Sequence, residues 1–81
     1  MYKNKAENGA NNLCGAKVKE LRENMQGRPS QRAFADMLQR AGLDVDKNAV
    51  QRIECGRRFV TDIELRVIAD VLGVTCDALL R

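Results

Sequence analysis

The chain has no histidine and no tryptophan, and its only aromatic residues are Tyr2, Phe34 and Phe59. With so few rings, the core has to be built from aliphatic side chains. The three cysteines, at positions 14, 55 and 76, are odd in number and widely spaced, so they fit neither a disulfide framework nor a CxxC metal motif. Without histidine ligands as well, no metal site is expected, and the cysteines are expected to be reduced thiols.

Long apolar runs are missing too. No stretch approaches the roughly 20 apolar residues that span a membrane. The polar N-terminus, MYKNKAENGANN, lacks the apolar segment of a signal peptide. We therefore expect a cytoplasmic protein with no membrane contact. The sequence also has no phosphate-cradling glycine loop and no evident pair of catalytic carboxylates, so no enzyme, cofactor or small-molecule ligand is expected.

The sequence does contain helical periodicity, and no convincing alternation typical of strands, which favours an all-α fold. A chain of 81 residues is one small domain. The polar, asparagine-rich residues 1–12 are expected to form a disordered tail, and residues 13–81 the domain. We expect five short helices: residues 13–25, residue 31 to a stop at Gly42, about residue 47 to a stop at Gly56, residues 62–72 and residues 76–80.

Residues that cap helix N-termini precede four of these segments. Their side-chain oxygens can accept hydrogen bonds from the unpaired N–H groups of a first helical turn. Thr61 and Glu64 also have the spacing of a reciprocal capping box. The expected caps are Ser30, Asp44 or Asp46, Thr61 and Thr75.

The second and third segments are the most informative. The second has one apolar face, formed by Phe34, Ala35, Leu38 and Ala41. The third is expected to bury Val50 and Ile53. Its other face carries polar side chains that folding does not require and that can reach base edges and phosphates. An ordinary helical hairpin with a solvated face explains the same pattern. These polar side chains are Lys47, Asn48, Gln51 and Arg52.

The charge is unevenly distributed. Residues 15–58 carry a net charge of +4, whereas residues 59–81 carry −2 and residues 1–14 carry +1. The positive excess therefore coincides with the second and third segments. This asymmetry gives weak support to an anionic polymer as the partner.

Four stretches together resemble the phage-repressor and Cro type of helix-turn-helix domain, also called XRE-type: GAKVKELRE, SQRAFADML, VQRIECGRR and LRVIADVLGVTCDALL. The resemblance covers residues 15–80. It implies a five-helix lambda-repressor-like domain in which the second and third helices form the helix-turn-helix. It also implies sequence-specific binding of double-stranded DNA and transcriptional regulation, with repression favoured over activation.

The resemblance also assigns roles to individual residues. The base-reading positions are Lys47, Asn48 and Arg52, with Gln51 beside them. The expected phosphate contacts are Gln31, Arg32, Arg57 and Arg58. Arg22 and Glu54 match a structural ion pair between the first and third helices. Residues 36–47 are about five residues longer than in the common form of the family, which is more than one helical turn. We expect residues 37–43 to lengthen the second helix, which affects whether Arg40 reaches a phosphate.

A single domain of this size has a small footprint on DNA. A homodimer is therefore expected on a two-fold operator, with half-sites about one turn of DNA apart. Its contacts would come from the last two helices, around Val71, Val74 and Leu79, unless these residues belong to the core.

The alternative function is a protein-interaction adaptor or antitoxin-like module that uses the same fold.

Overall fold

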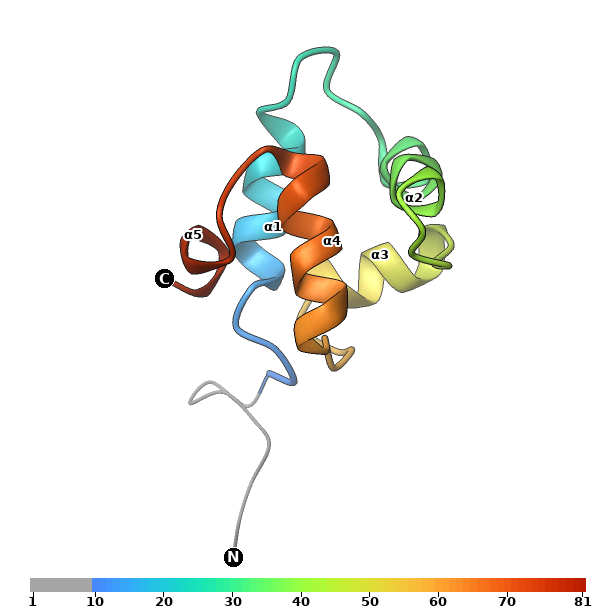
Figure 1. Ribbon diagram of the computed structural model, residues 1–81. Coiled ribbons are helices and arrows are strands. Elements are labelled where there is room, and N and C mark those ends of the chain that lie inside the picture. The colour runs from blue at the N-terminus through green and yellow to red at the C-terminus, as the bar shows by residue number, and fades with distance from the viewer. Residues whose placement is uncertain (1–9) are drawn as a thin grey trace, which may run out of the picture.

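The computed structural model describes residues 10–81, so residues 1–9 of the tail predicted over residues 1–12 lie outside the described residues. Within residues 10–81 the structure contains five α-helices and no strand, which confirms the all-α prediction (Figure 1). None of these helices is long and apolar enough to cross a membrane. The helices are α1 (Gly15–Glu23), α2 (Gln31–Arg40), α3 (Lys47–Glu54), α4 (Asp62–Leu72) and α5 (Cys76–Leu80).

Aliphatic side chains at helical spacing bring the five helices around one core. α1 packs against α3 and α4, α2 packs against α3 and α4, and α5 packs against α4. In Figure 1, α1 and α4 therefore lie centrally, with α5 on one side and α2 and α3 on the other. The largest side chains that are fully buried are Phe34, Leu38, Ile53, Ile68 and Leu79.

The side chains that cap the helices were largely predictable. Ser30 accepts from Ala33 N at 3.1 Å, and of the two candidate aspartates it is Asp46 that caps α3, accepting from Ala49 N at 2.8 Å. Thr61 and Glu64 form the complete capping box at the start of α4. Thr75 caps α5. α4 and α5 have the predicted bounds because these signals lie within one helical turn of the residues they act on.

The end of α2 differs from the prediction. The helix reaches Arg40 and does not extend to residue 43, and Ala41 is exposed rather than part of the buried face. Gly42 adopts a φ of +99°, and Leu43 N donates to Leu38 O while Gly42 N donates to Gln39 O. These paired bonds are those of a Schellman motif, which terminates a helix. The additional residues therefore lengthen the connector between α2 and α3, and Val45 of that connector is buried in the core.

α1 is also shorter than the predicted segment 13–25. Asn24 N donates to both Glu20 O and Leu21 O, so the helix tightens and then ends. Gly27 and Arg28 follow with φ values of +84° and +44°. The left-handed conformation of Arg28 precedes Pro29, whose ring disfavours the right-handed helical region for the residue before it.

The segment just before α1, which the sequence assigned to the tail, is packed against the domain. Asn11 and Asn12 hydrogen bond to the backbone at the C-terminal end of α3 and in the following link. Their amides pair with carbonyls distant in sequence, which composition alone could not indicate. The packed part of the chain therefore includes residues 10–12.

Candidate nucleic-acid interface

The outer face of α3 is polar and exposed. Lys47, Asn48, Gln51 and Arg52 are all exposed, whereas Val50 and Ile53 on the opposite face are each only 1% exposed. Residues four apart on a helix are neighbours, so Lys47 lies beside Gln51 and Asn48 beside Arg52. Within residues 10–81, neither Lys47 nor Arg52 forms an ion pair. Their charges are thus available to an external ligand.

A buried ion pair fixes the C-terminal end of α3. Arg22 Nε donates to Glu54 Oε2 at 2.6 Å, and Arg22 Nη2 donates to Glu54 Oε1 at 3.0 Å. Arg22 Nη1 also donates to Pro29 O at 2.9 Å, which ties the link before α2 to the same guanidinium. The two residues are 8% and 7% exposed. The hydrogen bond to Glu54 raises the pKa of Arg22, against the opposing effect of burial. The pair thus joins α1 to α3, as the family resemblance implied.

Gln31 lies beside this pair. Its Nε2 donates to Glu54 Oε1 at 3.0 Å, so this side chain, expected at a phosphate, is linked to the ion pair through one N–H. An amide nitrogen carries two hydrogens, which leaves the second available. Gln31 can therefore offer its second N–H to a ligand at the start of α2 while the first N–H donates to Glu54.

Arg32 and Lys47 come together across the two helices. They line an open pocket of about 250 Å³ between α2 and the start of α3, with Ala35, Asp36, Gln39 and Asp46. Both basic residues are exposed. A residue expected at a phosphate and one expected at bases thus line the same depression.

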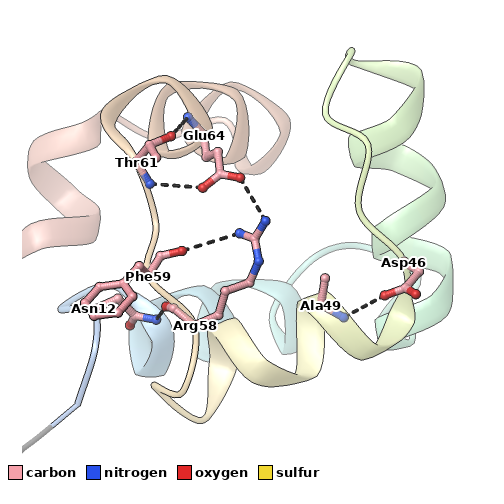
Figure 2. A network of polar contacts seen from close by, with 7 residues as sticks. All are labelled: Asn12, Asp46, Ala49, Arg58, Phe59, Thr61 and Glu64. Atoms are coloured by element: carbon pink, nitrogen blue, oxygen red, sulfur yellow. Dashed lines mark hydrogen bonds and ion pairs between the residues drawn. The ribbon is translucent and has the colours of Figure 1, made fainter.

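The link between α3 and α4 places its two arginines differently. Arg57 is exposed, and its side chain forms no ion pair with any described residue. Arg58 is half-buried, and its Nη2 donates to Glu64 Oε2 at 3.0 Å (Figure 2). Arg58 Nη1 lies 3.5 Å from Phe59 O, as a weak second contact. Of the two arginines in this link, only Arg57 has a side chain without a hydrogen-bond or ion-pair partner among the described residues.

Glu64 is held by both of its oxygens. Oε1 accepts from Thr61 N at 3.0 Å within the capping box, while Oε2 accepts from Arg58. Burial acts to raise the pKa of Glu64, but the hydrogen bond from Thr61 and the pairing with Arg58 outweigh it, so the pKa lies below its ordinary value. The capping box, visible in the sequence, thus places the carboxylate that pairs with Arg58.

The residues predicted to mediate a dimer are not equally accessible. Val71 and Val74 are half-buried and pack against the core, whereas Leu79 is fully buried. Leu79 therefore belongs to the core of its own chain and cannot contact a second copy. The sequence by itself left this alternative open for the three residues. Among residues 10–81, the large apolar side chains that remain exposed are Leu13, Phe59, Ile63 and Leu80.

The described residues contain no group of three or more cysteine, aspartate or glutamate side chains placed to hold a metal ion. The cysteines are free thiols. Cys14 is buried, and this burial raises the pKa of its thiol.

Compared with known proteins, the chain matches no family model, no curated protein and no solved structure.

Proposed function

We propose that this protein is a sequence-specific double-stranded-DNA-binding protein that regulates transcription, most simply as a repressor. In this proposal α2 and α3 form the helix-turn-helix of a lambda-repressor-like domain in the cytoplasm. The observation that carries it is the outer face of α3, where Lys47, Asn48, Gln51 and Arg52 are exposed together. The opposite face of the same helix is anchored in the core.

The chemistry of these side chains suits the major groove. Asn48 can form paired hydrogen bonds with adenine, and Arg52 or Lys47 can donate to the two acceptors of guanine. A rigid helix lowers the cost of ordering such donors on binding. α3 meets this condition because Asp46 caps its first turn and Arg22 holds its last residue.

Phosphate contacts would supply most of the affinity and would not depend on sequence. The proposed donors flank α3: Gln31 and Arg32 at the start of α2, and Arg57 after α3. Arg58 takes a supporting role in this scheme, because reaching a phosphate would require it to leave Glu64. A homodimer would place two such domains on half-sites about one helical turn apart.

The first experiment is selection of bound sites from a random duplex library, followed by titrations with the selected site and a scrambled one. We expect Arg52→Ala to reduce the ratio between the two affinities, since each bidentate base contact contributes about 1–3 kcal/mol of discrimination. Arg66→Ala, which changes an exposed arginine of α4, is the matched control. An equal loss on both duplexes would contradict a base-reading role for Arg52.

A protein-interaction adaptor or antitoxin-like module remains the second candidate. The exposed apolar side chains Phe59 (54% exposed) and Ile63 (74% exposed) favour it, because such groups suit a protein partner. Titration of the wild type with random duplex DNA at low and moderate salt separates the two functions. Salt-sensitive binding supports the DNA proposal, whereas its absence supports the adaptor.

A further inference from the structure

Asn12 joins the start of α1 to the end of α3 and to the link after α3, which lie about 40 residues further along the chain. Its Nδ2 donates to Ile53 O at 3.1 Å and to Arg58 O at 2.7 Å, and its Oδ1 accepts from Gly15 N at 2.8 Å. Figure 2 shows its bond to Arg58. The side chain therefore connects the start of α1, the end of α3 and the link that carries the two arginines.

Asn11 extends this connection to Arg57. Its backbone N–H donates to Gly56 O at 2.7 Å, and its Nδ2 donates to Arg57 O at 2.9 Å. From the other side, the N–H groups of Arg57 and Arg58 donate to Arg52 O at 2.8 and 3.3 Å. The backbone around Arg57 is thus held through its N–H by α3 and through its carbonyl by Asn11.

The fit between these segments is close. A Cβ added at Gly15 would lie 2.2 Å from Ile53 O, and one added at Gly56 would lie 2.9 Å from the Cβ of Ala10. Gly56 also has a φ of +78°, a conformation that favours glycine. Ala10 and the start of α1 therefore pack directly against the backbone at the end of α3.

We propose that Asn12, assisted by Asn11, is a positioning residue for the contact between Arg57 and a DNA phosphate. This inference rests on the proposed DNA-binding function. Arg57 has an exposed side chain with no ion pair among the described residues, so only its backbone fixes where the guanidinium can reach. A backbone fixed before binding avoids part of the ordering cost of the contact.

The test is a salt titration of binding to random duplex DNA. Each neutralised phosphate contributes about 0.9 to the slope of log affinity against log salt, which corresponds to about eightfold in affinity for each tenfold change in salt. We expect Asn12→Ala to lower the magnitude of the slope by up to about 0.9, which is the contribution of one phosphate. Asn11→Ala should lower it by less. Asn24→Ala, which truncates an exposed asparagine at the end of α1, should leave the slope unchanged.

The same substitutions in an Arg57→Ala background separate positioning from general stability. If Asn12 acts through Arg57, the slope of Arg57→Ala falls no further when Asn12→Ala is added. An equal effect of Asn12→Ala in both backgrounds would show a merely structural role and overturn the inference. Asn11→Ala keeps the whole Asn12 network, so it provides the same test if Asn12→Ala does not fold.

Two other outcomes distinguish the inference from the function on which it rests. A wild-type slope retained in both folded asparagine variants overturns the positioning role and leaves DNA binding intact. A wild-type protein that shows no salt-dependent binding overturns both proposals together.

Discussion

The two ends of α3 are stabilised in different ways. At its start, Asp46 accepts from Ala49 N, and Gln39 Nε2 donates to Val45 O at 2.6 Å across six residues. At its end, Glu54 pairs with Arg22 from 32 residues earlier, and Ile53 O accepts from Asn12 across 41 residues. The first end is built by nearby residues, and the second depends on α1 and on the segment before it.

This difference separates the two parts of the proposed interface. Lys47 and Asn48, expected at bases, stand on the locally built end. Arg57, expected at a phosphate, follows the end that requires distant contacts. Substitutions at the start of α3 should therefore act locally, whereas substitutions at its end should disturb the packing of α1 as well.

The largest effect is expected from Glu54→Ala. It leaves the buried Arg22 guanidinium without its carboxylate, and breaking a buried ion pair in this way costs about 3–5 kcal/mol. Urea unfolding followed by circular dichroism measures the loss. The matched control is Asp77→Ala, which removes an exposed pair with Arg81 and should cost about 0.5 kcal/mol or less. Equal losses in the two variants would contradict the contrast between the two kinds of pair.

Gly15→Ala is expected to destabilise the protein although alanine is the better helix former. The new Cβ would meet Ile53 O at 2.2 Å, so α1 and α3 have to separate. Overpacking of this kind costs about 1–3 kcal/mol. Thermal unfolding should show a lower midpoint than that of the wild type. A higher midpoint would mean that α1 can move away from α3 at little cost.

Asp46→Ala tests the locally built end. Loss of an N-cap costs about 1 kcal/mol, and faster amide exchange should be confined to the first turn of α3. Asp44→Ala is the control, because Asp44 is exposed and caps no helix among those described. If exchange also increased across α1, the start of α3 would depend on distant contacts after all.

The smallest effect is expected from Glu64 and depends on pH. Its folded-state pKa is depressed, so its stabilising contribution is present above the ordinary glutamate pKa of about 4.3. That contribution is lost as the pH falls through the lower folded value. The stability difference between the wild type and Glu64→Gln should therefore shrink below about pH 4. A difference that stays constant from neutral pH to pH 3 would exclude a contribution from Glu64 ionisation.

The sequence by itself determined the features that depend on neighbours within a helical turn. Apolar spacing indicated the all-α fold, and Thr61 with Glu64 set the start of α4. The alternation between buried Val50 and exposed Gln51 likewise follows from the helical period. The pair between Arg22 and Glu54 was expected from a family resemblance rather than from spacing.

Only the tertiary structure decided which polar side chains bond to one another and which apolar side chains are buried. The bond from Gln31 to Glu54, the engagement of Arg58 by Glu64, and the burial of Leu79 all depend on how the helices pack. So does the binding of Asn12 to the end of α3, where composition had predicted a disordered tail. A side-chain amide can bond to water, to its own turn or to a distant carbonyl, and packing selects among these partners.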